Sequence, residues 1–135
     1  MKFLAAQIVL ALEYLPTCRI LNRDLEPANI MVFEHGYLKL GDFGLAKKVC
    51  ERTDTWLGSL HFMTPGIVAK INSHGSSVDW WAFSVMLFQV VFDEYPFTDS
   101  GWNLQKNMQM ILSKPLEFPE LPAYGEALDL IENLI

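Results

Sequence analysis

The sequence predicts a mainly α-helical domain with one or two small β-hairpins. Three observations predict this class: apolar residues recur at helical spacing near the start, residues 80–92 are almost wholly apolar, and two short apolar runs flank a glycine turn at residues 34–36. With 135 residues, of which 51% are hydrophobic and 19% charged, the chain suits one folded domain with a modest core.

The first segment is expected to form an amphipathic core helix, because its apolar residues recur every three or four positions. They are Leu4, Ile8, Ala11, Leu12 and Leu15. The helix should end near Leu15, since Pro16 disfavours helical geometry in the residue before it and cannot donate a backbone hydrogen bond. A signal peptide is the alternative, but Gln7 and Glu13 interrupt the apolar run.

Two apolar runs at residues 30–33 and 37–40 predict a short hairpin, with Gly36 free to take a positive φ in the turn. Residues 45–77 lack a clean period, which predicts a long loop with one short helix after Pro65. A connection of this length inside a compact domain usually has a function.

Residues 80–92 are too few to span a bilayer, so this segment is expected to form a helix buried inside the domain. Asp79 falls in its first turn, where a carboxylate suits the helix dipole, and the helix should stop before Pro96. Further helices are expected over residues 102–112 and 123–135. The core of the domain should include Phe83, Met86, Phe88 and Phe92.

A formal net charge of −6 argues against binding nucleic acids or anionic membranes through broad neutralisation of phosphate. The only two cysteines, Cys18 and Cys50, do not form a metal-binding pair, and we expect buried or idle thiols in a reducing compartment. The expected location is therefore the cytoplasm, with the nucleus as an alternative.

Two short motifs indicate a chemistry. Residues 22–29 read Asn-Arg-Asp-Leu-Glu-Pro-Ala-Asn, and residues 41–44 read Gly-Asp-Phe-Gly. The first resembles the catalytic loop of protein kinases and the second resembles their magnesium-binding motif. Residues 3–15, 53–66 and 78–83 resemble the helix before that loop, the end of the activation segment and the start of the central helix.

Together these five segments resemble the C-terminal lobe of a Ser/Thr protein kinase, closest to the cyclic-nucleotide-dependent (AGC) group. The resemblance implies a helical lobe around a central helix. It also places the family's N-terminal lobe, with its glycine-rich loop and strand lysine, upstream of Met1, and no G-x-G-x-x-G occurs in the sequence. We therefore expect residues 1–135 to be a partial kinase domain, truncated at both ends.

The resemblance implies a role for each motif residue in phosphoryl transfer. Asp24 would orient the substrate hydroxyl as a base, and Asn29 and Asp42 would hold Mg²⁺. Phe43 and Gly44 complete the cofactor-binding motif, in which Gly44 gives the backbone freedom to turn. The implied cofactors are ATP and Mg²⁺, although a chain without the N-terminal lobe would keep only half of the ATP pocket.

Thr55 matches the activation-loop phosphothreonine of the family, and Arg23 and Lys47 match two basic residues that would clamp its phosphate. The alternative, that Thr55 is an exposed loop threonine without a regulatory role, stays open.

The departures from the family pattern predict impaired catalysis. Glu26 replaces the lysine that contacts the transferring phosphate, and at about 4 Å and an effective dielectric constant of about 20 such an interaction is worth roughly 4 kcal/mol. Its loss alone could slow transfer roughly a thousandfold. Ser59 keeps a hydroxyl where the family has the threonine that bridges base and lysine, and Gly66 replaces a glutamate that pairs with a buried arginine.

Substrate choice is also expected to differ, because neutral or aromatic residues occupy three positions where relatives use carboxylates to bind substrate arginines. They are Ala28, His61 and Gln89. If the chain binds a peptide, we expect no strong preference for arginine upstream of the acceptor.

Three functions stay open on the sequence. The chain is a Ser/Thr kinase, or a fragment of one, that has little or no activity by itself; or it is a pseudokinase that binds a kinase-associated protein; or it is a decayed gene product. Its expected partner is accordingly a protein substrate or a kinase-associated protein, and neither nucleic acid nor membrane.

Overall fold

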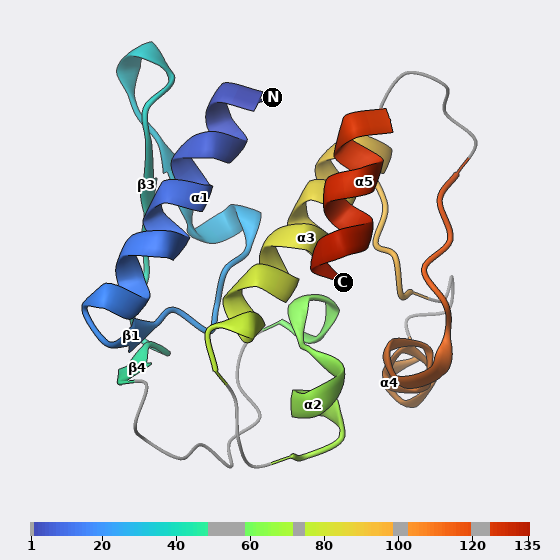
Figure 1. Cartoon of the computed structure of the whole chain (residues 1–135). Helices are drawn as coiled ribbons and strands as arrows, with labels where there is room; N and C mark the ends of the chain where they lie inside the picture. Colours follow the sequence, from blue (N-terminus) through green and yellow to red (C-terminus); the bar gives the residue numbers. More distant parts are fainter. Residues whose placement is uncertain (1, 49–58, 72–74, 99–102, 120–124) are drawn as a thin grey trace.

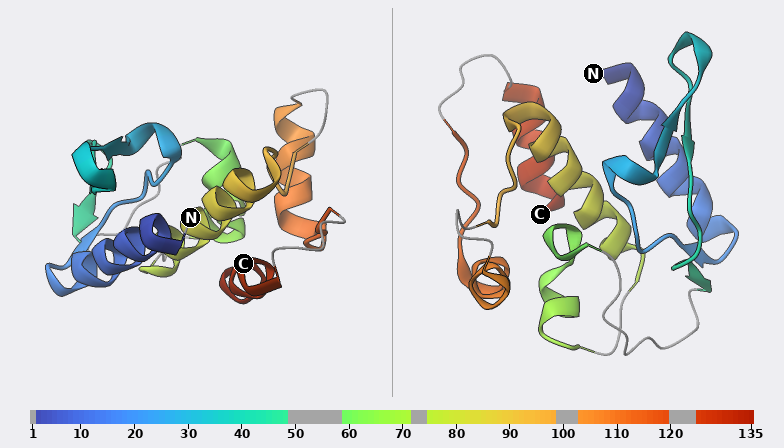
Figure 2. Two further views of the ribbon diagram at one scale, coloured as in Figure 1. Left: turned by 90° about the horizontal axis from the view of Figure 1, so that it is seen from above. Right: turned by 180° about the vertical axis from the view of Figure 1, so that it is seen from behind.

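The central element of the fold is the long helix α3 (Ser77–Phe92), which packs against α1 (Lys2–Thr17) and α5 (Gly125–Leu134) (Figures 1 and 2). The computed structural model describes residues 2–48, 59–71, 75–98, 103–119 and 125–135. The short helix α2 (Pro65–Val68) packs against α4 (Leu104–Ser113) beside the start of α3. The prediction of a mainly helical fold with small pairs of strands is confirmed.

Of the predicted apolar face of α1, Ile8, Leu12 and Leu15 lie in the core. Ala11 is only partly buried and Leu4 is 39% exposed. The helix was predicted to end near Leu15, but it continues through Pro16 and ends at Thr17. A proline in the last turn costs only one backbone bond there. The turn is closed instead by the N–H of Arg19, which donates to the carbonyl of Pro16 at 2.9 Å, and Arg19 ends the helix with a φ of 59°.

The predicted hairpin is confirmed. Strands β2 (Ile30–Val32) and β3 (Leu38–Leu40) pair antiparallel, with Ile30 opposite Leu40. A 3₁₀ turn, η2 (Glu34–Gly36), joins them, and Gly36 takes a φ of 77° as expected. His35 also takes a left-handed φ of 62°, so the turn needs two unusual backbone conformations and not one.

The long segment after the hairpin contains more structure than the sequence predicts. Strand β4 (Lys47–Lys48) pairs antiparallel with β1 (Ile20–Leu21). Strands of two residues are too short to show an alternating pattern, so the sequence does not predict this pairing. Further on lie η3 (Leu60–Phe62) and the expected short helix α2, whose first turn is capped by Thr64, since its Oγ1 accepts from the N–H of Ile67 at 3.3 Å.

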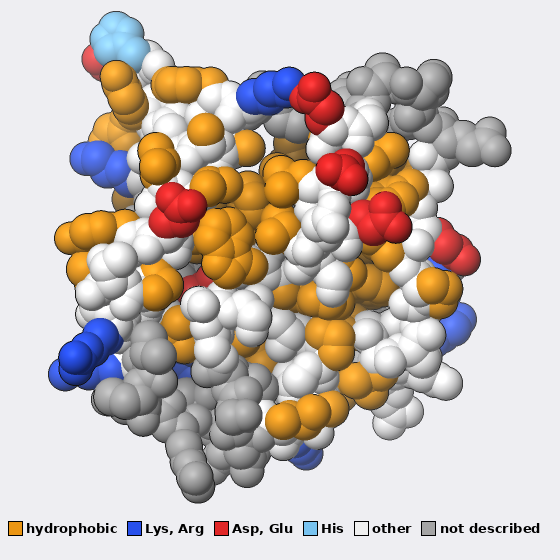
Figure 3. Space-filling view, in the orientation of Figure 1, with side chains coloured by type: hydrophobic (Ala, Val, Ile, Leu, Met, Phe, Trp, Pro, Cys, Tyr) orange, Lys and Arg blue, Asp and Glu red, His pale blue; other side chains and the backbone are white. Residues whose placement is uncertain are grey.

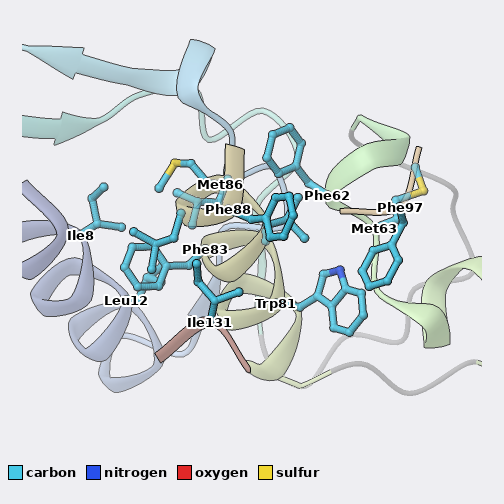
Figure 4. Packing of buried hydrophobic residues seen from close by; sticks show 14 of the residues in the cluster. Ile8, Leu12, Phe62, Met63, Trp81, Phe83, Met86, Phe88, Phe97 and Ile131 are labelled. Carbon is cyan, nitrogen blue, oxygen red and sulfur yellow. The ribbon is translucent and has the colours of Figure 1, made fainter. Parts of the chain in front are cut away.

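Helix α3 supplies more of the buried core than any other element (Figure 4). Phe83, Met86 and Phe88 are buried as predicted, and Phe92 is half-buried against the same cluster. The helix ends at Phe92, before Pro96, with Asp93 in a left-handed conformation. In the part of the chain that the structure describes, no helix is both long and apolar enough to cross a membrane.

The last two helices also form where the sequence predicts them. Helix α4 covers residues 104–113 against the predicted 102–112, and α5 covers 125–134 against 123–135. Asn103 caps α4 through its side-chain oxygen, which accepts from the N–H of Lys106 at 3.1 Å. Ile131 of α5 is fully buried, and α5 packs along α3 and closes the core there.

Candidate active site

The loop at residues 22–29 is anchored to α3 by a buried carboxylate. Asp79 is only 4% exposed, and its two oxygens accept from the backbone N–H groups of Asn22 at 2.9 Å and Arg23 at 2.7 Å. Arg23 takes a left-handed φ of 67°, which the paired bonds hold in place. Burial raises the pKa of Asp79, while the two N–H bonds and the charge of Arg23 oppose that rise.

Asp79 is a site residue whose structural role the sequence analysis missed. It was assigned only a favourable position in the helix dipole, although a carboxylate beside Trp80 and Trp81 in an apolar helix indicates a buried acceptor with specific donors. Leu25 also fixes the loop, because its side chain is 1% exposed and lies in the core.

Asp24 and Asn29 are brought together by the 3₁₀ turn η1 (Pro27–Asn29), which folds the loop back on itself. The side-chain amide of Asn29 donates to the backbone carbonyl of Asp24 and to its Oδ2, both at 2.9 Å. Burial is the main cause that raises the pKa of Asp24, and the charges of Glu26 and Asp42 add to it, while the bond from Asn29 lowers it. The carboxylate is thus oriented by one neighbour and surrounded by two further acids.

The hairpin places Asp42 beside this pair. Because Ile30 pairs with Leu40, the residues just outside the strands, Asn29 and Gly41, lie next to each other, and the N–H of Gly41 donates to the carbonyl of Asn29 at 2.7 Å. Asp42 then turns with a φ of 42°, and its Oδ1 accepts from the N–H of Gly44 at 2.8 Å. A Cβ at position 44 would lie 2.9 Å from that same Oδ1, so any other residue here would displace the Asp42 carboxylate.

The donor set at this corner fits Mg²⁺. Asn29 uses its amide N–H₂ on Asp24 and keeps its carbonyl oxygen, and Asp42 keeps one carboxylate oxygen beyond its bond to Gly44. Two hard oxygen ligands, completed by water and phosphate, are what Mg²⁺ commonly takes from a protein. Among the described residues, no group of three or more His, Cys, Asp or Glu side chains is arranged to hold a metal, so tighter all-protein coordination is not built here.

Glu26 and Ser59 form a pair across the site. The hydroxyl of Ser59 donates to Oε2 of Glu26 at 2.5 Å, which ties the loop at 22–29 to the N-terminal end of η3. Ser59 also lines a hollow of about 290 Å³, open to solvent, whose other polar residues are Arg23 and Asp24. Its walls are apolar: Leu25, Phe62, Met63, Ile67, Val78 and Ala82.

The remaining predicted residues are placed as follows. The guanidinium of Arg23 donates to the carbonyl of Leu45 from Nε at 2.8 Å and from a terminal nitrogen at 2.6 Å, and Lys47 lies in β4. Thr55 lies outside the described residues, so the proposed phosphate clamp stays a prediction. Phe43 is 46% exposed.

Three positions were expected from the sequence to influence substrate recognition. Ala28 is exposed in η1. The ring of His61 stacks on that of Tyr95, with centroids 4.1 Å apart, and the side-chain amide of Gln89 donates to the hydroxyl of Tyr95 at 3.1 Å. Burial lowers the pKa of His61, which favours its neutral form. Tyr95 was not singled out in the sequence, yet it joins the other two into one neutral cluster.

The comparison with family models decides the family. All of residues 1–135 match the model described as the protein kinase domain. The chain belongs to the protein kinase family. The order of motifs and the geometry of Asp24, Asn29 and Asp42 agree with this assignment.

Individual kinases align with nearly the whole chain. The cAMP-dependent protein kinase catalytic subunit of Arthrobotrys oligospora is 37% identical over 134 residues, which cover 99% of this chain and 25% of the relative. The cAMP-dependent protein kinase type 3 of Saccharomyces cerevisiae is 39% identical over 134 residues, or 33% of its length. The catalytic subunit from Dictyostelium discoideum is 40% identical over 134 residues. The chain thus spans a third or less of each of these kinases.

Proposed function

We propose that this chain carries the hydroxyl-binding and metal-binding half of a Ser/Thr kinase site, and that it transfers phosphoryl groups from ATP to protein hydroxyls only slowly. The observation that supports the first part is the hydrogen bond between Asn29 and Asp24, with Asp42 held next to them by the bond from Gly41 to Asn29. One base and two metal ligands from two separate motifs converge at this corner.

Each residue has a defined task in this proposal. Asp24 accepts the hydrogen bond of a substrate serine or threonine hydroxyl and orients its oxygen for attack. Asn29 and Asp42 hold Mg²⁺, which when bound neutralises charge on the phosphates. The bonds from Asn22 and Arg23 to Asp79 keep the loop in one conformation, so that Asp24 does not have to be ordered at the moment of reaction.

The slow rate follows from the charge at position 26. Glu26 lies close enough to raise the pKa of Asp24, and it places an anion where phosphoryl transfer needs a cation. An attraction worth roughly 4 kcal/mol is therefore replaced by a repulsion. The hydroxyl of Ser59 donates a hydrogen bond to the Glu26 carboxylate but does not neutralise its negative charge.

The deciding experiment restores the cation. Glu26→Lys should raise the rate of γ-phosphate transfer to a serine peptide by about three orders of magnitude. Glu13→Lys is the matched control, since it makes the same charge change on the exposed face of α1 and should leave the rate unchanged. Asp24→Ala in the Glu26→Lys background should abolish transfer. A folded Glu26→Lys chain without measurable transfer would reject catalysis by these residues.

A second candidate function is protein binding without catalysis, in which the chain docks a kinase-associated protein. The observation that favours it is an exposed apolar surface around the hairpin and the start of α1 (Figure 3). Its members are Phe3, Met31, Val32, Phe33 and Tyr37, which are 46–72% exposed. Exposed apolar clusters of this kind are typical of interaction sites.

This candidate makes a different prediction. Saturable binding of a kinase catalytic or regulatory subunit should survive Asp24→Ala and should be lost in Val32→Asp, because Val32 is 72% exposed at the centre of the surface. Val90→Asp, on the exposed part of α3, is the control. Equal binding by Val32→Asp and Val90→Asp would exclude this surface.

A further inference from the structure

Asp24 is held by an asparagine on either side of it. The backbone N–H of Asp24 donates to the side-chain oxygen of Asn22 at 3.2 Å. The side-chain amide of Asn29 donates to the backbone carbonyl and to Oδ2 of Asp24, both at 2.9 Å. Asn29 is also a candidate metal ligand, whereas the side chain of Asn22 has no task in the proposed function.

The side chain of Asn22 is fully buried. Asn22 is 1% exposed, and its backbone N–H donates to Oδ2 of Asp79 at 2.9 Å. Burying an amide side chain is costly unless it forms hydrogen bonds, so a buried asparagine indicates a specific partner. That partner is the N–H of Asp24, which can only donate, and the amide of Asn22 therefore turns its oxygen toward it.

The bond between Asp24 and Asn22 closes a tight turn around Arg23. An asparagine that accepts from the N–H two residues later replaces one backbone unit of a turn. Arg23, in the middle, takes a left-handed φ of 67°, which is unfavourable for a residue with a Cβ. Asp79 accepts from the N–H groups of Asn22 and Arg23, and Asn22 accepts from the next one. Side chains thus fix three consecutive N–H groups.

We propose that Asn22 is a positioning residue for phosphoryl transfer, which holds the backbone of Asp24 and thereby aims its carboxylate at the substrate hydroxyl. The inference rests on the proposed function, in which Asp24 is the base. Asp24 lies in neither a helix nor a strand, so its direction depends on the bonds at its N–H and its carbonyl. Asn22 fixes the first of these groups and Asn29 the second.

The bond to Asn22 also steadies the metal corner. Asn29 is joined to Asp24 by two hydrogen bonds, so an Asp24 that turns at its N–H end pulls the side chain of Asn29 with it. The same side chain supplies the carbonyl oxygen proposed to bind Mg²⁺. Because a displacement of about 1 Å can slow a reaction roughly a hundredfold, a small turn at Asp24 would reduce the rate without preventing substrate binding.

The first test needs no nucleotide. Asn22→Leu keeps the approximate size of the side chain and removes its acceptor, and amide hydrogen exchange is measured by NMR. The N–H of Asp24 should exchange faster by about tenfold or more. The N–H groups of position 22 and Arg23 should keep their protection, because Asp79 still accepts from them. Asn22→Ser should restore part of the protection of Asp24, since a serine hydroxyl can accept from the N–H two residues later.

Asn107→Leu is the matched control for both tests. Asn107 is also a buried asparagine, 2% exposed, but it lies in α4, which packs against α2. Its substitution should destabilise the fold and leave the exchange of the Asp24 N–H unchanged. Unchanged protection of Asp24 in Asn22→Leu, or an equal loss in Asn107→Leu, would overturn the proposal. If Asn22→Leu does not fold, Asn22→Ala removes the same acceptor and carries the same expectation.

The second test measures transfer to a serine peptide in the Glu26→Lys background. Asn22→Leu should lower kcat by about tenfold to a hundredfold, while KM for the peptide and for ATP changes by less than about twofold. Asn22→Ser should recover kcat to within about threefold of the Asn22 parent, because it restores an acceptor for the N–H of Asp24. Asn107→Leu should leave kcat unchanged.

The outcomes separate this inference from the proposed function. A Glu26→Lys chain that transfers nothing rejects the proposed function, and faster exchange confined to Asp24 in Asn22→Leu still supports the hold of Asn22 on that residue. Transfer by Glu26→Lys with the same kcat in Asn22→Leu overturns the inference and leaves the proposed function standing. A fall in kcat that Asn22→Ser does not reverse also overturns it, because the acceptor would then not be the cause.

Discussion

The backbone N–H of Arg23 donates to Oδ1 of Asp79 at 2.7 Å, and this bond fixes the loop at 22–29 to the first turn of the central helix α3. Arg23 holds a left-handed conformation that few arginines adopt, so the bond stabilises strained backbone at the site. The geometry of Asp24, the next residue, therefore depends on a residue of α3 that lies outside the loop.

Removing this anchor should destabilise the fold. Asp79→Ala leaves the N–H groups of Asn22 and Arg23 buried without their acceptor, and we expect the free energy of unfolding to fall by about 2–4 kcal/mol. Chemical denaturation measures this change. The control is Asp129→Ala on the exposed face of α5, which should change stability by no more than about 0.5 kcal/mol. Similar losses in the two variants would contradict the anchoring role.

The centre of the core should be equally sensitive. Phe83 is fully buried in the middle of α3, and Phe83→Ala should lower the free energy of unfolding by about 3–5 kcal/mol through lost burial and a cavity. Phe3→Ala is the matched control, because Phe3 is 59% exposed and packs only edge-on against Tyr37. If both variants lost the same stability, α3 would not be the centre of the core.

The titration of Asp24 should respond to Glu26. Burial raises the pKa of Asp24 first, and the negative charge of Glu26 raises it further. Glu26→Gln removes that charge, so Asp24 should lose its proton at a lower pH, and any activity that needs the ionised carboxylate should begin at a lower pH. Asn29→Ala should do the opposite, because its bond lowers the pKa. NMR titration of the Asp24 carboxyl carbon distinguishes the two shifts, and a shift of the same sign in both would refute this explanation.

Peptide selection should not favour arginine. At three positions where relatives use carboxylates to bind substrate arginine, this chain has Ala28, His61 and Gln89. Tyr95 stacks on the ring of His61 and accepts a hydrogen bond from Gln89. A guanidinium has no carboxylate to bind in this cluster. A peptide array, read as binding or as transfer by the Glu26→Lys variant, should show similar signals with and without arginine before the acceptor. A tenfold preference for arginine would contradict this expectation.

Local signals made much of the site predictable. Gly36 indicated the hairpin turn, and the pairing of β2 with β3 then brought Asn29 next to Gly41, the residue before Asp42. The apolar run after Asp79 likewise predicted the buried helix. These features depend on contacts between residues close in sequence or on a strong period.

Other features depend on distant contacts that no local pattern contains. The pairing of β1 with β4 joins Ile20 to Lys48, and the bond between Ser59 and Glu26 joins residues 33 positions apart. Sequence indicated that both Glu26 and Ser59 depart from the family pattern. It could not show that the two substitutions contact each other, because a hydrogen bond depends on the three-dimensional path of both segments.

The bonds to Asp79 also determine when the loop can take its final conformation during synthesis. They join residues separated by 56 and 57 positions, so on a ribosome that adds about 5–20 residues per second the loop at 22–29 emerges seconds before its acceptor. During that interval the N–H groups of Asn22 and Arg23 face water, and the left-handed turn has nothing to hold it. The conformation of the loop at 22–29 is therefore acquired late in translation, after α3 has emerged.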